Sequence, residues 1–314
     1  TVNPEPQIID YIEVICHNET FSFTPVNGNG ANIVPAGTTY TWDTPVSDPD
    51  SIVTGGSAQE NQTNISQQLL NITSLEGTLI YTVTPTSVDG CAGESFDVTI
   101  TVNPEPQLTN FTDTVCEGDT FADITPLDNT DGVVPTGTTY TWVIANTSSD
   151  AIEGASASTS ASATIPGSQL TLVDGTTSPQ DLIYTVIPTS ADDCVGETFT
   201  ITITVNPTAQ VNEIVDQVKC NGDLTDAIVF STVNTDGATT YSWINDNTSI
   251  GLAESGDENN IPSFAAIAGS SSEIATIVVT PTYTNNGIPC TGPTETFTIT
   301  VNPTAQVNEI VDQV

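Results

Sequence analysis

The six cysteines are the residues of this chain whose type and spacing most clearly suggest chemistry. They are spread along 314 residues, and no two of them form a C-x-x-C pair. Structural zinc sites are usually built from such close pairs, so this spacing argues against zinc. Cysteines in a chain rich in Thr and Asn instead indicate disulfide bonds formed in an oxidising compartment. The six are Cys16, Cys91, Cys116, Cys194, Cys220 and Cys290.

No arrangement of residues in the sequence predicts catalysis. His17 is the only histidine, so a histidine-based catalytic triad cannot recur along the chain. The sequence contains no G-x-S-x-G, H-E-x-x-H, phosphate-binding or dinucleotide-binding motif. We therefore predict that the chain is not an enzyme, has no catalytic or cofactor-binding residues, and carries His17 as a solvated loop residue.

Acidic residues dominate the charge of the chain. It has 39 Asp and Glu residues against a single basic residue, Lys219, and a formal net charge of −38. A protein that binds nucleic acid needs a basic surface, so nucleic acid is excluded as a partner, and anionic lipid is disfavoured for the same reason. No run is long and apolar enough to predict insertion of this segment into a membrane. With one basic side chain, salt bridges cannot be a main source of stability.

Internal repeats of about 100 residues define the organisation of the chain. The tetrapeptide TVNP begins at Thr1, Thr101, Thr204 and Thr300, and a T-T-Y-[ST]-W motif recurs in step with it. A repeat of this length has the size of one small domain. We place one Ig-like repeat in each of residues 1–103, 104–206 and 207–302, here called units 1, 2 and 3. Residues 303–314 are predicted to be the first strand of a fourth repeat.

Each unit has the sequence pattern of β-strands. Phe96, Val98, Ile100 and Val102 alternate with polar residues, which places one face of a strand on a core and the other in water. Turn-forming residues separate such runs, and no amphipathic helix is convincing. We therefore predict an all-β protein of tandem Ig-like β-sandwich domains in a head-to-tail elongated array. The strands of unit 1 are placed at residues 7–14, 20–25, 38–43, 65–72, 79–85 and 94–102.

One tryptophan lies in the middle of the third predicted strand of each unit. Trp42, Trp142 and Trp243 are expected to be core residues beneath the sandwich. A role in stacking on a ligand would need other exposed aromatic residues nearby, and aromatic residues make up only 6% of the chain.

Clustered carboxylates in the predicted loops are candidates for calcium, which takes carboxylate and carbonyl oxygens. The clusters lack D-x-D-x-D-G spacing and do not fall at one position of the repeat. We therefore expect no dedicated metal site, and keep weak calcium binding as the alternative. The candidates are Asp48, Asp50, Asp128, Asp131, Asp257 and Glu258.

The order of these landmarks resembles the PKD-like and Ig-like tandem domains of giant cell-surface adhesins from gliding Bacteroidetes (flavobacteria). The residues that carry the resemblance are the repeated V-N-P, the V-C-E-G-D turn at residues 115–119, the Y-T-W strand and the final T-F-T-I-T-I-T-V-N-P strand. The resemblance implies adhesion, an extracellular location on the bacterial surface and secretion by an outer-membrane export system. The typical W-D-F-G-D-G-like turn is absent from this chain, where W-D-T-P-V-S, W-V-I-A-N-T and W-I-N-D-N-T occur, so no property of that turn is transferred.

Two disulfide pairings remain open. Bonds within a unit are the simpler assignment, but Cys16 and Cys91 lie in turns at opposite ends of the predicted sandwich. The last strand between those ends spans roughly 30 Å, and a disulfide needs Cα atoms within about 7 Å. In a head-to-tail array with short proline-containing linkers, neighbouring units would bring the two kinds of turn together. The alternative bonds are Cys16–Cys194 and Cys116–Cys290, with Cys91 and Cys220 left for units outside this segment.

Two functional hypotheses follow. The first is a structural repeat segment of a long extracellular adhesin or surface filament, a disulfide-stabilised stalk that projects binding regions. The second is a carbohydrate- or protein-binding module that uses the variable loops at residues 45–64, 146–168 and 245–263. These loops differ in length and composition, which favours the stalk. The expected partners are neighbouring repeats, other copies of the chain in a fibre through edge strands at residues 7–14 and 94–102, and an extracellular surface or glycan.

Overall fold

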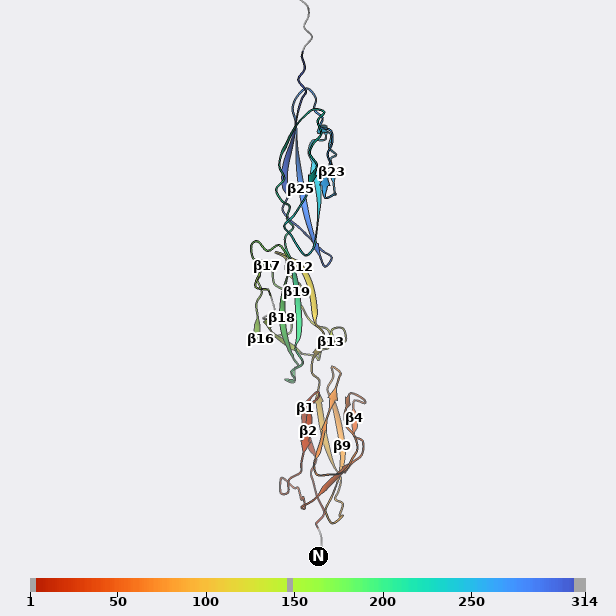
Figure 1. Cartoon of the computed structure of the whole chain (residues 1–314). Coiled ribbons are helices and arrows are strands. Elements are labelled where there is room, and N and C mark those ends of the chain that lie inside the picture. Colours follow the sequence, from red (N-terminus) through yellow and green to blue (C-terminus); the bar gives the residue numbers. More distant parts are fainter. Residues whose placement is uncertain (1–3, 146–148, 308–314) are drawn as a thin grey trace, which may run out of the picture.

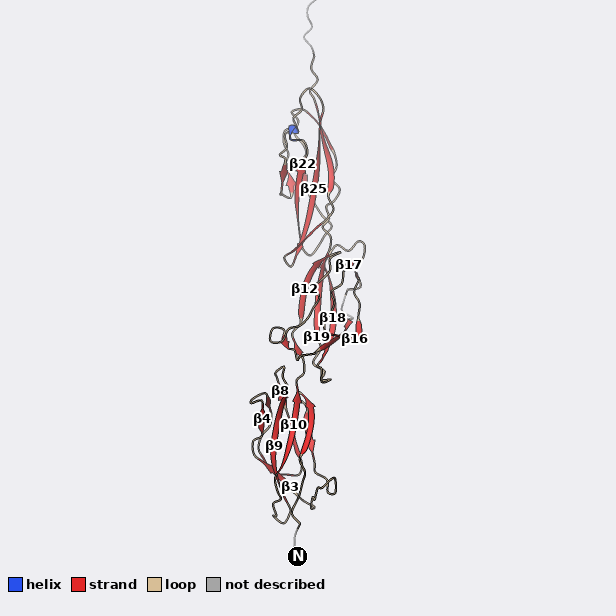
Figure 2. Cartoon of the chain, turned by 180° about the vertical axis from the view of Figure 1, so that it is seen from behind, coloured by secondary structure: helices blue, strands red, loops and turns tan. Residues whose placement is uncertain are grey.

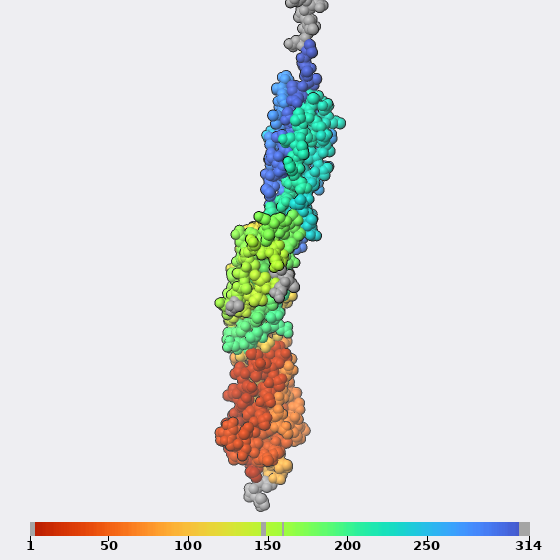
Figure 3. All heavy atoms as spheres, turned by 60° about the vertical axis from the view of Figure 1, so that its left-hand side comes forward, coloured from red at the N-terminus to blue at the C-terminus, as the bar shows by residue number. Residues whose placement is uncertain are grey.

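The chain forms a thin column of three β-sandwich units stacked end to end (Figure 1). The computed structural model describes residues 4–145 and 149–307. Each unit encloses its own hydrophobic cluster, and the three clusters are separate. In the space-filling view the units follow one another without a break in the surface (Figure 3). The tandem β-sandwich architecture predicted from the sequence is therefore confirmed.

Unit 1 contains the first ten strands. They are β1 Tyr11–Cys16, β2 Thr20–Phe23, β3 Thr39–Trp42, β4 Val46–Asp48, β5 Val53–Thr54, β6 Gln59–Gln62, β7 Ile65–Gln68, β8 Leu70–Asn71, β9 Gly77–Thr86 and β10 Phe96–Asn103. The larger sheet has the order β1-β10-β9-β3-β6, and β4 also pairs with β9. The second layer is made of the short pairs β2-β7 and β5-β8.

Units 2 and 3 repeat this plan. Their larger sheets have the orders β12-β19-β18-β14-β16 and β20-β27-β25-β22-β23. The strands of unit 2 are β11 Gln107–Leu108, β12 Phe111–Cys116, β13 Gly132–Val133, β14 Thr139–Ile144, β15 Ile152–Glu153, β16 Ser158–Ser162, β17 Thr171–Leu172, β18 Gln180–Thr189 and β19 Phe199–Asn206. Those of unit 3 are β20 Gln217–Cys220, β21 Ile228–Val229, β22 Ala238–Asn245, β23 Ser255–Gly256, β24 Asn260–Ile261, β25 Glu273–Asn285, β26 Ile288–Thr291 and β27 Glu295–Asn302, with the 3₁₀ turn η1 at Thr248–Ile250.

In the larger sheet of each unit, the strand that comes first along the chain runs parallel to the strand that comes last. The other strand pairs are antiparallel. β1 pairs in parallel with β10, β12 with β19, and β20 with β27. Seen from behind, these long strands run along the axis of the column (Figure 2). The chain therefore enters and leaves each unit in the same direction, as a head-to-tail array requires.

The period-two pattern places the core where the sequence predicts it. Side chains of Phe96, Val98, Ile100 and Val102 are at most 3% exposed. The tryptophans Trp42, Trp142 and Trp243 are 3%, 6% and 6% exposed and belong to the three clusters. Trp42 and Trp142 each donate an indole N–H to a backbone carbonyl, of Ser57 and Ser156 respectively.

The structure corrects three details of the predicted strands in unit 1. The segment predicted at 7–14 is divided, because Gln7 bridges to Ile33 and the chain joins the larger sheet only from Tyr11. The segment predicted at 65–72 is two strands, β7 and β8, with Leu69 between them. The segment predicted at 94–102 is not an edge strand, because β10 lies between β1 and β9.

Candidate functional site: the junctions between repeats

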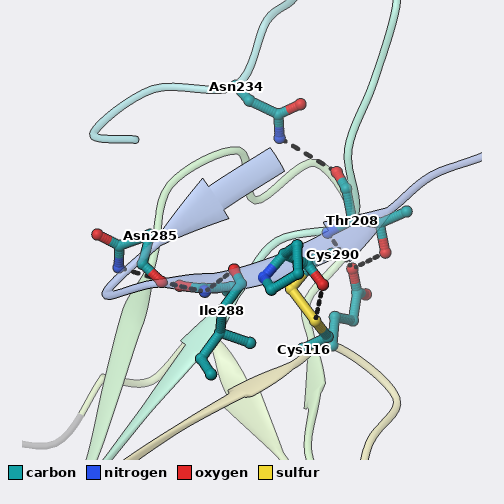
Figure 4. The surroundings of a disulfide bond; sticks show 9 residues. Cys116, Thr208, Asn234, Asn285, Ile288 and Cys290 are labelled. Atoms are coloured by element: carbon teal, nitrogen blue, oxygen red, sulfur yellow. Dashed lines mark hydrogen bonds between the residues drawn. A yellow bond between two sulfur atoms is a disulfide. The ribbon is translucent and has the colours of Figure 1, made fainter. Parts of the chain in front are cut away.

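The disulfide bonds join neighbouring units. Cys16 ends β1 opposite Asn103, at the end of β10, so it lies far from the turn that precedes β10 and contains Cys91. The bonds are Cys16–Cys194, with Cα atoms 5.7 Å apart, and Cys116–Cys290, with Cα atoms 5.6 Å apart. Of the two pairings that the sequence left open, the structure therefore has the one between units. Figure 4 shows Cys116 bonded to Cys290 at the junction of units 2 and 3.

The turn after each first strand holds its cysteine in the same way in all three units. The backbone N–H groups of Glu19, Asp119 and Asp223 donate to the carbonyls of Cys16, Cys116 and Cys220. The residue between, Asn18, Gly118 or Gly222, has a positive φ of 64°, 86° or 92°. Asn and Gly are the residues that tolerate this conformation best. The local sequences C-H-N-E, C-E-G-D and C-N-G-D therefore encode one turn.

A glycine two residues after the other cysteine lets the linker pack closely, a feature that sequence reasoning missed. It occurs three times as C-x-G, at Gly93, Gly196 and Gly292. A Cβ atom at these glycines would lie 1.9, 1.9 and 1.7 Å from the carbonyl oxygens of Pro6, Pro106 and Ala209. None of the three has a positive φ, so space and not backbone conformation requires glycine. The threefold recurrence of C-x-G was the signal that could have revealed this contact.

The V-N-P linkers are buried where units flank them on both sides. Asn103 and Pro104 are buried at the first junction, and Asn206 and Pro207 at the second. The equivalent Asn302, at the outer end of unit 3, is exposed. Burial of the linker therefore comes from contact between units and not from the unit that carries it.

The junction of units 2 and 3 has a dense set of polar contacts. The Nδ2 group of Asn206 donates to the carbonyl of Asn285 at 3.1 Å, and Asn285 Nδ2 donates back to Asn206 Oδ1 at 3.0 Å (Figure 4). Glu117 Oε2 accepts two hydrogen bonds from Thr208, from its backbone N–H at 3.2 Å and from its hydroxyl at 2.7 Å. Asn286 also donates to Thr114, on β12. These bonds tie the β25–β26 hairpin and the linker to unit 2.

The junction of units 1 and 2 has fewer such contacts. Ser74 donates its hydroxyl to Asp128 Oδ2 at 2.6 Å across the junction. That hydrogen bond, together with a backbone N–H from Val134, lowers the pKa of Asp128 below its ordinary value. The Oδ1 atom of Asn103 is buried and has no partner among the described residues.

Acidic groups also gather at the first junction. Burial raises the pKa of Glu105 in the linker, and nearby His17 opposes the shift while Glu19 and Glu197 add to it. His17 is half-buried, and its Nδ1 atom accepts the backbone N–H of Asn71 at 3.0 Å. The prediction of a solvated loop residue is therefore wrong for His17, because the junction covers it.

The residue after each first cysteine faces the residue after each linker proline. His17 is electrostatically coupled to Glu105, Glu117 accepts hydrogen bonds from Thr208, and Asn221 Nδ2 donates to Thr304 Oγ1 at 3.4 Å. This position varies along the repeat together with its partner. Sequence reasoning found His17 only as the single histidine and missed the pairing, because the two positions are about 90 residues apart.

The carboxylates predicted as calcium candidates do not come together at one site. Asp128 and Asp131 accept hydrogen bonds within their own loop, from Val134 and Leu127 respectively. Asp48 and Asp50 are exposed around the end of β4, and the Asp257–Glu258 pair is exposed after β23. Within residues 4–145 and 149–307, no group of three or more His, Cys, Asp or Glu side chains could hold a metal ion. Calcium binding stays a prediction, and a thermal melt with and without chelator is its test.

Cys91 and Cys220 carry no disulfide in the described part of the chain. Cys91 is half-buried, and Cys220 is exposed. Cys91 occupies the position of the bonded Cys194 and Cys290, and Cys220 that of the bonded Cys16 and Cys116. They lie at the outer faces of units 1 and 3, away from the two junctions.

The fold and the junctions define a tandem array of Ig-like β-sandwiches of an extracellular type, linked covalently from unit to unit. The family profile described as a PKD-like domain matches residues 13–106 and 111–209. The chain belongs to the PKD-like domain family. No curated protein sequence matches it.

Several solved structures of multidomain proteins are similar to this chain. Three N-terminal domains of the Hoc outer capsid protein of bacteriophage RB49 match with 11% identity and a TM-score of 0.41, covering 92% of this chain and 95% of that one. An I-band fragment of titin matches with 11% identity and a TM-score of 0.34, covering 96% and 97%. Extracellular domains 3–5 of Drosophila OTK match with 10% identity and a TM-score of 0.32, covering 96% of both chains.

The described residues contain no helix that is long and apolar enough to cross a membrane.

Proposed function

We propose that this chain is a structural section of a long extracellular adhesin or surface filament, in which the repeats form a stalk. The observation that carries the proposal is that both disulfides connect one unit to the next. A bond inside a domain stabilises that domain, whereas a bond between domains fixes how one domain stands on another. The covalent bonds therefore serve the shape of the array.

The surface charge supports the same role. With 39 acidic residues and one basic residue, like charges repel along the column and oppose its folding back on itself. The only ion pair among the described residues joins Lys219 to Asp226, at 3.0 Å. At 0.1 M salt, repulsion between exposed charges is largely screened beyond about 10 Å. The disulfides and the buried linkers are therefore what keep the column straight at high ionic strength.

The proposed place of the stalk is the surface of a gliding bacterium of the Bacteroidetes, with residues 1–103, 104–206 and 207–302 as its repeats and 303–314 as the start of another. The support is the V-N-P, V-C-E-G-D and Y-T-W landmarks together with membership of the PKD-like family. Antibodies against the segment and electron microscopy of the native cell surface test this. Labelled threads with one bead per repeat are expected, and labelling confined to the cytoplasm would contradict the proposal.

The binding-module hypothesis has weaker support. The stretch at residues 45–64 contains β4, β5 and β6, whereas the stretch at 245–263 contains η1 and the short strands β23 and β24. Part of the stretch at 146–168 lies outside the described residues. A binding site repeated in every unit would need these loops to be alike, and the first and third differ in their secondary structure.

Two experiments separate the hypotheses. Small-angle scattering of the oxidised segment is expected to show a rod-shaped particle, with greater bending after reduction of the disulfides. A glycan array with the same segment is expected to be blank. Reproducible binding of one glycan class would favour the binding module over the stalk.

A further inference from the structure

We infer that the two disulfides create two continuous covalent paths that run side by side through all three units. Tension applied along the column is carried by these paths without unfolding the sandwiches. Each path consists only of first strands, last strands, linkers and disulfides. The inference concerns how the molecule carries force, and it does not depend on where the stalk is displayed or on what it binds.

The first path begins at the N-terminal end of the chain and follows β1 through unit 1 to Cys16. The disulfide then carries it to Cys194, at the near end of unit 2. From Cys194 it follows β19, the V-N-P linker and β20 to Cys220, at the far end of unit 3. This path therefore spans the three units while leaving out the chain between Cys16 and Cys194, which are 178 positions apart in the sequence.

The second path is the complement of the first. It begins at Cys91, at the outer end of unit 1, and follows β10 and the linker to β12 and Cys116. The second disulfide carries it to Cys290, and β27 takes it through unit 3 to Asn302. It leaves out the chain between Cys116 and Cys290, which are 174 positions apart.

The two paths are hydrogen-bonded to each other in every unit. The first path contains β1 in unit 1, β19 in unit 2 and β20 in unit 3. The second path contains β10, β12 and β27 in the same units. Each of these pairs is parallel and in register, with Tyr11 opposite Val98, Phe111 opposite Ile201, and Gln217 opposite Ile299. The column thus contains one two-stranded parallel ribbon from end to end.

Neither path has much length in reserve. A β-strand already rises about 3.3 Å per residue, and a fully extended chain reaches at most about 3.6 Å per residue. Pulling can therefore lengthen the strand portions of a path by only about a tenth. The remaining strands of each sandwich are not part of either covalent path. Their detachment therefore adds nothing to the end-to-end length of a path.

Connectivity, and not the strength of the sandwich, limits the extension. Without the disulfides, pulling on a tandem array unfolds its domains one after another, and each adds its full contour length. Here the Cys16–Cys194 bond removes residues 17–193 from the shortest covalent route between the N-terminus and Cys220. That route has 16 residues up to Cys16 and 27 from Cys194 to Cys220, against 220 along the chain.

Single-molecule force spectroscopy tests the inference on the full chain. One handle is attached at the N-terminus and the other at the exposed thiol of Cys220, in a Cys91→Ser background that leaves one free thiol. The oxidised protein is expected to show no unfolding step before the tether breaks. A reductant is expected to allow lengthening by roughly 600 Å, the contour of the bypassed residues at 3.3–3.6 Å each.

A pair of double variants supplies matched controls, because each removes one disulfide. C16S/C194S cuts the first path, and the pull to Cys220 is expected to lengthen by roughly 500 Å, since the second bond still bypasses part of the chain. C116S/C290S leaves the first path intact, and the same pull is expected to show no lengthening. Moving the handles to Cys91 and the C-terminus, in a Cys220→Ser background, is expected to exchange the two results.

The outcomes are decisive in either direction. Unfolding steps of hundreds of ångströms in the oxidised chain overturn the inference, whether or not the variants fold. So does equal lengthening of the two double variants with handles at the N-terminus and Cys220. The intensity and wavelength of tryptophan fluorescence show whether each variant retains its three cores, in which Trp42, Trp142 and Trp243 are buried.

Discussion

The two junctions of this chain share one covalent design but differ in their other contacts. Both have a disulfide, a tight turn after the first strand, and a C-x-G glycine against the linker. At the second junction, however, the hairpin of unit 3 is longer: β25 has 13 residues, whereas the corresponding β18 of unit 2 has 10. The longer hairpin reaches unit 2 and contacts β12.

The buried asparagine of the V-N-P linker shows the consequence. Asn206 exchanges hydrogen bonds with Asn285 at the tip of the longer hairpin, whereas Asn103 has an unpaired Oδ1 atom. The comparison teaches that the covalent link is the repeated element and that the polar packing around it varies. We therefore expect the first junction to depend more on its disulfide than the second.

Removal of each disulfide in turn should produce the largest difference. C16S/C194S is expected to free the first junction to bend widely, because few polar contacts remain across it. C116S/C290S should bend less, because the bonds of Glu117, Asn206 and Asn286 persist. The distribution of angles between units in negative-stain electron micrographs measures both. Equal broadening at the two junctions would contradict the comparison.

Substitution of the C-x-G glycine should have the next largest effect, and it should be similar at both junctions. Gly292→Ala places a Cβ atom against the carbonyl oxygen of Ala209, and Gly196→Ala does the same against Pro106. Overpacking of this kind costs about 1–3 kcal/mol, so thermal melts should show lower stability for both variants. Gly269→Ala is the control, because nothing lies within 4 Å of its Cβ position. A large loss in the control, or none in Gly292→Ala, would contradict the packing argument.

The linker asparagines should differ from each other by a smaller amount. Asn206→Ala leaves the carbonyls of Asn285 and Ile288 without their donor and is expected to cost about 1–3 kcal/mol. Asn103→Ala removes an oxygen that already lacks a partner, so its cost should be distinctly smaller. Chemical denaturation of the two variants measures the difference. A larger loss for Asn103→Ala would reverse our ranking of the two junctions.

The smallest expected effect is a pH dependence at the first junction. Burial raises the pKa of Glu105 above its ordinary value of 4.5, so its protonated form fits the junction better than its charged form. The contribution of protonated Glu105 to the stability of the folded protein is present below pH 4.5. It is lost as the pH rises through the raised pKa of Glu105. Glu105→Gln should therefore be slightly more stable than the wild type at pH 7, with the gain shrinking as the pH falls to 4.5.

The neighbouring Asp128 sets the lower limit of that measurement. Its pKa is lowered from 3.8, so its contribution is present above that value and is lost as the pH falls through the lowered pKa. Between pH 7 and 4.5 Asp128 stays charged, and the difference in stability between wild type and Glu105→Gln reports on Glu105. If Glu105→Gln proved less stable than the wild type at pH 7, the expected sign of the Glu105 effect would be wrong.

Most of the fold could be predicted from the sequence because its determinants are local. Alternation of Phe96, Val98, Ile100 and Val102 marks one buried face, whereas the division of the segments predicted at 7–14 and 65–72 escaped the pattern. Period-two hydrophobicity shows which residues face a core, but it does not show which strand lies beside which. For that reason the last strand was wrongly expected at an edge of the sheet, where β1 lies instead.

The candidate site could be predicted only in outline. Strand length placed Cys16 and Cys91 at opposite ends of a unit, which argued against a bond within the unit, but the sequence alone did not choose between the two pairings. The close contact at Gly292 and the pairing of Glu117 with Thr208 left only weak traces in the sequence. Both contacts join segments that are about 80–90 residues apart, so no local pattern in the sequence reports them.

By itself, the sequence determined the repeat, the β-sandwich class, the acidic surface and the two kinds of cysteine-bearing turn. These follow from the order of residues along the chain, because side-chain periodicity, turn preference and charge are properties of short segments. Only the tertiary structure decided that Cys16 meets Cys194 and that Cys116 meets Cys290. The physical reason is that the first strand of each unit is parallel to its last, which places the two turns at opposite ends and leaves each cysteine to be reached from the neighbouring unit.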